Sequence, residues 1–86
     1  MRILSQDGMI DVPYEQVGVS INHKNKTDIV AYPAGNYVCG SHWIMAEYSS
    51  TQKAQNAMEM LHKEWENFGE SGLFRFPQDD EVEDWE

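Results

Sequence analysis

One amphipathic helix, preceded by a polar capping sequence, constrains the fold of this chain most strongly. Ser49 and Gln52 match a capping box, in which the two side chains bind the free backbone amides at a helix start. The apolar residues that follow form a single helical stripe: Ala54, Ala57, Met58, Leu61, Trp65 and Phe68. Gly69 or Gly72 ends the helix. Because a helix with one apolar stripe must bury it against another layer, the rest of the chain has to supply a sheet face.

The remaining sequence is typical of short strands separated by turns. Apolar and polar residues alternate, and turn sequences such as Asp7-Gly8 and residues 33–36 separate the runs. Within the second run the apolar phase slips by one residue, which predicts a bulge or break near Glu15 and Gln16. Strands are therefore expected at residues 1–5, 10–21, 28–32, 37–48 and 73–76.

These elements predict an α+β fold. A small antiparallel sheet of about four to five strands, in the order β-β-β-β-α-β, carries the helix on one face. Simple alternation in the fourth strand places Ile44, Ala46 and Tyr48 on one face, and Trp43, Met45 and Glu47 on the other.

Charge divides the chain into a body and a tail. The 86 residues carry a net charge of −9, and six of the fifteen acidic residues lie in the last eight positions. Residues 1–77 are expected to form a single domain, and residues 78–86 a flexible acidic tail. The acidic residues of that tail are Asp79, Asp80, Glu81, Glu83, Asp84 and Glu86.

The same balance of charge argues against several classes of partner. The six basic residues form no cluster, so neither direct binding to nucleic acid nor adhesion to an anionic membrane is expected. No run approaches the roughly 20 apolar residues that span a bilayer, and the first residues lack the apolar core of a signal peptide. With one cysteine the chain forms no intrachain disulfide, and the cytoplasm is the expected compartment.

Catalytic and metal-binding patterns are absent from the sequence. Cys39 and His42 form an isolated Cys-x-x-His pair, but a structural zinc site needs four ligands, and no second pair has matching spacing. The same pair lacks the helix start that activates a nucleophilic thiol. No glycine-rich phosphate-binding loop is present. The sequence therefore predicts no metal, no cofactor and no enzymatic activity.

Two groups of residues are candidates for binding. In the acidic tail, Asp79, Asp80, Glu81, Glu83 and Asp84, with Trp85 as an apolar anchor, could engage a basic surface on a partner protein. The bland alternative is a solvated terminus that keeps the protein soluble. The aromatic residues Tyr32, Tyr37 and Trp43 could stack on a nucleotide base, although packing between strands is the simpler explanation.

Three stretches of the chain resemble a group of small proteins encoded by phages and prophages of Gram-positive bacteria. They are the start, MRILSQDG continuing into IDVPYE; the helix region, AEYSS, KA and AMEML; and the end, FRFP with DDEV. Residues from about 18 to 44 do not share this pattern. The resemblance implies a setting in the host cytoplasm and a partner that is a host bacterial protein with a basic surface.

By that resemblance the leading expectation is a phage-encoded binding protein of the counter-defence type. It inhibits or modulates a host protein, with carboxylates that imitate the phosphates of nucleic acid. Two alternatives stay open. One is a nucleotide-sequestering protein that uses the aromatic residues, and the other is a structural accessory protein that forms a homodimer through an exposed sheet edge.

Overall fold

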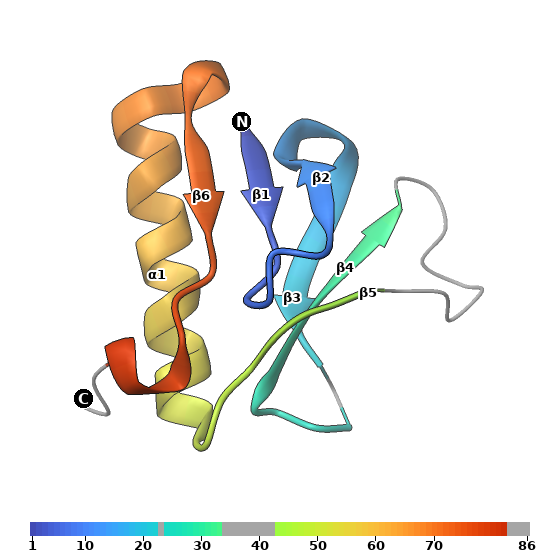
Figure 1. Cartoon of the computed structure of the whole chain (residues 1–86), viewed down its shortest axis with the longest axis vertical. Coiled ribbons are helices and arrows are strands. Elements are labelled where there is room, and N and C mark those ends of the chain that lie inside the picture. The colour runs from blue at the N-terminus through green and yellow to red at the C-terminus, as the bar shows by residue number, and fades with distance from the viewer. Residues whose placement is uncertain (23, 34–42, 83–86) are drawn as a thin grey trace.

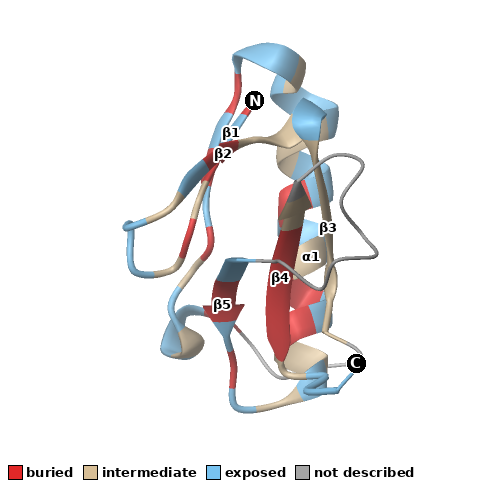
Figure 2. Ribbon diagram, turned by 90° about the vertical axis from the view of Figure 1, so that its right-hand side faces the viewer, coloured by how far each residue is buried: buried red, intermediate tan, exposed pale blue. Residues whose placement is uncertain are grey.

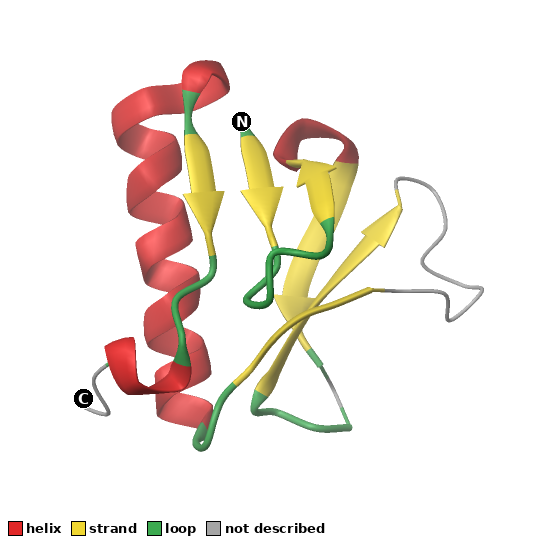
Figure 3. Ribbon diagram, viewed as in Figure 1, coloured by secondary structure: helices red, strands yellow, loops and turns green. Residues whose placement is uncertain are grey.

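The computed structural model describes residues 1–22, 24–33 and 43–82 of the chain. Within these residues the protein has six strands and one α-helix, with short 3-10 turns between some of them (Figures 1 and 3). In chain order the elements are β1 (Arg2–Leu4), β2 (Asp11–Pro13), β3 (Val17–Ile21), β4 (Asp28–Pro33), β5 (Trp43–Glu47), α1 (Thr51–Phe68) and β6 (Leu73–Arg75). The predicted α+β fold with a single packed helix is confirmed.

The strands form two small sheets. In the first sheet β1 lies between β2 and β6, antiparallel to β2 and parallel to β6. In the second sheet β4 lies between β3 and β5, and both pairings are antiparallel. The helix contacts β3 and β4 of the second sheet and β6 of the first, so it closes the core between them.

A 3-10 turn at Tyr14–Gln16 separates the two sheets at the predicted break. Pro13, which has no amide to donate, ends β2 at this point. The Tyr14 amide donates a hydrogen bond to the Met1 carbonyl at 2.8 Å, and the Tyr14 ring packs against the Trp65 ring with centroids 5.0 Å apart. The Met1 amino group forms an ion pair with Glu15 at 2.7 Å. The turn is thereby fixed to both β1 and the helix.

The helix begins one residue later than the capping box predicted. Ser50, and not Ser49, is the N-cap, and its Oγ accepts a hydrogen bond from the Lys53 amide at 3.1 Å. Gly69 ends the helix, as predicted, with a positive φ of 56° that glycine adopts without strain.

The apolar stripe of the helix is confirmed over most of its length. Ala54, Ala57 and Leu61 are fully buried, and Met58 and Trp65 are partly buried against the core. Phe68 is 56% exposed, because it lies on the last turn beyond the sheets. Asn56 is buried as well, although it does not belong to the apolar stripe. Figure 2 shows buried residues on β4, β5 and α1 and also on the strands of the first sheet.

A β-bulge in β5 changes the faces that simple alternation predicted. Ala46 pairs with Ile29 and Ile44 pairs with Val30, so Met45 is an extra residue between them. Met45 and Ala46 are consequently both buried, whereas Ile44 is 47% exposed. The predicted grouping of Ile44 with Ala46 is therefore wrong, because the bulge resets the alternation.

The beginning of the expected flexible tail is packed against the body. Residues Asp79–Glu81 form a 3-10 turn, and the side chain of Val82 is buried in the core cluster. Asp79 accepts a hydrogen bond from the Ser49 amide at 2.7 Å and forms an ion pair with Lys53 at 3.2 Å. The expectation of a mobile segment from residue 78 is thus corrected for residues 78–82, since two kinds of contact hold them. Residues 83–86 lie outside the described residues.

Replacement of Leu61 tests the role of the helix in the core. Its side chain is fully buried, so Leu61→Ala should lower the free energy of unfolding by about 2–5 kcal/mol through lost burial and a new cavity. Met60 is 42% exposed on the same helix, so Met60→Ala should change stability by about 0.5 kcal/mol or less. Denaturant unfolding followed by circular dichroism measures both; equal losses would contradict this packing.

Candidate partner-binding surface

Gln6 joins three parts of the chain that are distant in sequence. Its amide donates to the Met45 carbonyl of β5 at 2.7 Å, and its side-chain Oε1 accepts from the Glu47 amide at 3.0 Å. Its Nε2 donates to the Pro77 carbonyl at 3.1 Å. Its own carbonyl accepts from the Gln78 side chain at 2.7 Å. Gln6 therefore fastens β1, β5 and the segment after β6 to one another.

The two bonds to β5 occupy its outer edge. Ala46 is paired with Ile29, and the backbone amide and carbonyl of Ala46 face β4. Because backbone groups alternate in direction along a strand, the Met45 carbonyl and the Glu47 amide point away from the sheet. These are the groups that Gln6 binds. An edge that would otherwise be open for pairing is thus closed in part by a side chain from the other sheet.

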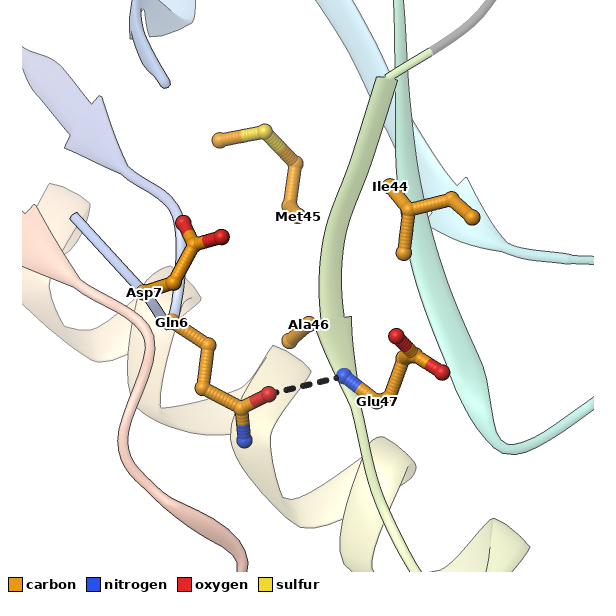
Figure 4. A pocket seen from close by; sticks show the side chains of 6 residues that line it. All are labelled: Gln6, Asp7, Ile44, Met45, Ala46 and Glu47. Carbon is orange, nitrogen blue, oxygen red and sulfur yellow. Dashed lines mark hydrogen bonds between the residues drawn. The ribbon is translucent and has the colours of Figure 1, made fainter. Parts of the chain in front are cut away.

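On the face of the second sheet that Asp28 and Glu47 share, the bulge also places Ile44; of these three residues Asp28 is buried (6% exposed), whereas Ile44 and Glu47 are exposed. Asp28 lies directly opposite Glu47 in the β4–β5 pairing, and side chains of directly paired residues share a face. Ile44 lies on the same face as Glu47, because the extra residue Met45 shifts the alternation of side chains along β5 by one position. In Figure 4, Ile44 and Glu47 point to one side of β5 and Met45 and Ala46 to the other.

The charge of this surface is unbalanced. Among the described residues, neither Asp28 nor Glu47 forms an ion pair. Like charges directly opposite each other on neighbouring strands are destabilising. We call the exposed surface formed by Asp7, Ile44 and Glu47, which line one pocket beside β5, the β5 surface; Asp28 adds its charge from a buried position opposite Glu47.

Asp7 stands at the rim of a pocket of about 150 Å³ beside this strand, which Gln6 and residues 44–47 also line (Figure 4). Its carboxylate accepts hydrogen bonds from the Ser5 hydroxyl at 2.5 Å and from the Met9 amide at 3.0 Å. The Ser5 hydrogen bond is the main reason that the pKa of Asp7 lies below its ordinary value. Asp7 therefore keeps its negative charge to a lower pH than an ordinary aspartate does.

A second pocket, of about 320 Å³, lies on the other side of Gln6. Arg75, Phe76, Pro77, Gln78 and Glu81 line it. Arg75 donates to the Gln6 carbonyl at 3.3 Å, and the Glu81 side chain accepts from the Gln78 amide at 2.8 Å. The polar groups of this pocket are thus largely engaged with the backbone.

The structure gives the predicted tail residues different roles. Asp79 holds the helix start, and the Ser49 amide, followed by Lys53, lowers its pKa below the ordinary value. Asp80 and Glu81 are exposed beside the second pocket. The Asp79 carboxylate is therefore engaged with the Ser49 amide and Lys53, which corrects its assignment as a free contact for a partner. Glu83, Asp84 and Trp85 lie outside the described residues.

The predicted aromatic platform is not supported by the strand register. Trp43 is paired with Ala31, so the two side chains share a face, and the neighbouring Tyr32 points to the opposite face. Neither of the two pockets above is lined by Tyr32 or Trp43. Tyr37 is not among the described residues. The two described rings of the proposed nucleotide site therefore do not converge.

Cys39 and His42, the candidate metal or nucleophile pair, also lie outside the described residues. Over the described ranges, no three histidine, cysteine or acidic side chains come together in a way that could hold a metal ion. Over the same ranges, no helix is long and apolar enough to cross a membrane.

Sequence reasoning missed Gln6, Asp28 and Glu47. The signal for the carboxylate pair was weak, because it depends on the register between two strands and on the bulge at Met45. Gln6 gave no signal at all, since its partners lie about 40 and 70 positions away. Comparison with protein-family models, curated proteins and solved structures finds no match for this chain.

Gln6→Ala tests the junction. The substitution removes two side-chain hydrogen bonds, to the Glu47 amide and the Pro77 carbonyl, and should lower the free energy of unfolding by about 1–3 kcal/mol. Gln55→Ala, on the exposed side of α1, is the matched control and should have little effect. Chemical denaturation measures both variants, and an unchanged midpoint for Gln6→Ala would remove Gln6 from this role.

Acid should loosen the fold through three carboxylates. Hydrogen bonds and ion pairs lower the pKa values of Asp7, Glu15 and Asp79 in the folded state. The stability they contribute is therefore complete above the unfolded pKa of about 4 and is lost as pH falls through the lower folded-state values. Thermal unfolding between about pH 7 and about pH 3 should show this loss, and Asp79→Asn should reduce its size. A pH dependence identical in Asp79→Asn and wild type would contradict the assignment for Asp79.

Proposed function

We propose that this protein binds a basic segment of a partner protein through the β5 surface. The observation that carries the proposal is the exposed carboxylate of Glu47, which lies directly opposite the buried carboxylate of Asp28; neither is paired with a cation among the described residues. A lysine or arginine from a partner would relieve the repulsion between the two carboxylates.

The apolar part of the surface fits the same kind of side chain. Ile44 is 47% exposed and lies on the same face as the two carboxylates. Lysine and arginine carry long aliphatic stems that pack along apolar groups while the charged head reaches an acid. Asp7 adds a further carboxylate at the rim of the adjoining pocket. The surface therefore favours long basic side chains over other exposed residues.

The size of the pocket beside β5 favours a protein over a small ligand. Its volume of about 150 Å³ is below the roughly 300–1,000 Å³ typical of small-molecule sites. Together with the opposed faces of Tyr32 and Trp43, this argues against nucleotide sequestration at this pocket.

The net charge of −9 supports fast association with a basic surface. The resemblance to small phage and prophage proteins supplies the setting. The partner we propose is a bacterial host protein in the cytoplasm, and the effect is inhibition by occupation of its basic site. In this proposal Asp80, Glu81 and residues 83–86 extend the acidic area, and the protein performs no chemistry.

Charge-matched variants test the proposal. The immobilised protein is exposed to a lysate of a Gram-positive bacterium, retained proteins are eluted with salt, and binding of the purified candidate is titrated by calorimetry. Asp7→Asn with Glu47→Gln should weaken binding at least about tenfold, because two contacts to basic side chains are lost. Glu59→Gln with Glu66→Gln removes the same charge from α1 and should weaken it far less.

The tail is tested separately by truncation after Val82, which keeps Asp79 and Val82 in their packed positions. Equal weakening by the two double variants would show a general charge effect and would sink the proposed site. Binding that does not change between about 50 and 500 mM salt would also contradict it, since exposed charges are screened.

A further inference from the structure

Strand β3 lies at an edge of its sheet, and no other described strand pairs with its outer side. The Asn22 amide donates to the Asp28 carbonyl at 3.0 Å, which marks Asn22 and Asp28 as a hydrogen-bonded pair. Because antiparallel pairs alternate, Ser20 and Gly18 also face β4, and Val17, Val19 and Ile21 direct their backbone groups away from the sheet. No other described residue binds those outward groups.

The other sheet edges are blocked by ordinary means. β2 is three residues long and contains Asp11 and Pro13, and β6 is three residues long with an exposed arginine. β5 carries a bulge and is bound by Gln6. Short length, charge, proline and bulges are the usual devices that prevent edge pairing.

β3 has none of these devices. Its sequence is Val-Gly-Val-Ser-Ile, its five residues pair with β4 in unbroken register, and all five are partly exposed. Figure 2 shows β3 running along one side of the molecule.

We infer that β3 pairs with β3 of a second copy, antiparallel about a two-fold axis at Val19. In this register Val19 faces Val19 of the other copy, and Val17 faces Ile21. Each residue whose backbone groups point away from β4 is then opposite such a residue of the other copy, and the three pairs provide about six backbone hydrogen bonds. The pairing joins two three-stranded sheets into one sheet of six strands.

The charges that flank the strand complement one another in this arrangement. Glu15 precedes β3, whereas Lys24 and Lys26 follow it, and both lysines are exposed without an ion pair among the described residues. Antiparallel pairing keeps the lysines of the two copies at opposite ends of the paired strands and places them near Glu15 of the other copy, which is already paired with its own Met1 amino group. Parallel pairing would instead bring like charges together, which favours the antiparallel two-fold dimer.

The inference is independent of the proposed function. The β5 surface lies at the opposite edge of the second sheet, across β4 from β3. Pairing at β3 therefore leaves Ile44 and Glu47 available, and it gives the dimer two copies of the β5 surface.

Amide exchange measured by NMR, together with sedimentation, tests the dimer from about 10 μM to about 1 mM protein, a range suited to a short strand pairing. A dimer should form as concentration rises, and protection should appear at the amides of Val17, Val19 and Ile21. Those of Gly18 and Ser20 should be protected at every concentration. A monomer up to about 1 mM, or a dimer without new protection at these three amides, would overturn the inference.

Two kinds of variant locate the interface. Val19→Pro removes an outward donor at the centre of the pairing without removing a bond to β4, so it should raise the dissociation constant at least about tenfold. Lys26→Glu should also weaken the dimer, whereas Lys63→Glu on α1, with the same change of charge, should weaken it less. If Val19→Pro does not fold, the two lysine variants decide the matter. Equal effects of the two, or wild-type affinity in a folded Val19→Pro, would refute pairing at β3.

Discussion

The hydrogen bonds of Gln6 hold the rest of the structure in place. Each sheet has only three short strands, and its apolar face must be buried against another layer. Gln6 extends β1 of the first sheet into the edge of β5 in the second, and the same residue binds the chain after β6. With the helix packed against both sheets, this junction makes one body of what would otherwise be two weak units.

The C-terminal segment strengthens the same junction from the other side. The Tyr48 hydroxyl donates to the Pro77 carbonyl at 2.8 Å, and burial raises the pKa of Tyr48, so the hydroxyl keeps its proton. Asp79 then binds the start of the helix, and Val82 fills the core. The acidic end of the chain thus has a structural part, residues 79–82, before it offers any charge to a partner.

The two edges of the second sheet differ for a physical reason, and this difference separates the two proposed interactions. At β5 an extra residue twists the edge, and a glutamine from the first sheet binds its outward groups, so backbone pairing is blocked and the side chains become the contact surface. At β3 the register is unbroken, and the backbone itself remains available. The proposed partner can therefore contact side chains at β5 while a second copy pairs with the backbone of β3.

Local patterns in the sequence determined the elements of this protein. The helical stripe, the break near Glu15, the glycine after the helix and the alternating final strand all depend on residues a few positions apart, and each was found where predicted. The tertiary structure alone decided that the strands divide into two sheets, that Met45 is an extra residue, and that Asp28 faces Glu47. Those features arise from strand register and from hydrogen bonds that span tens of residues, and no local periodicity encodes the pairing of distant segments.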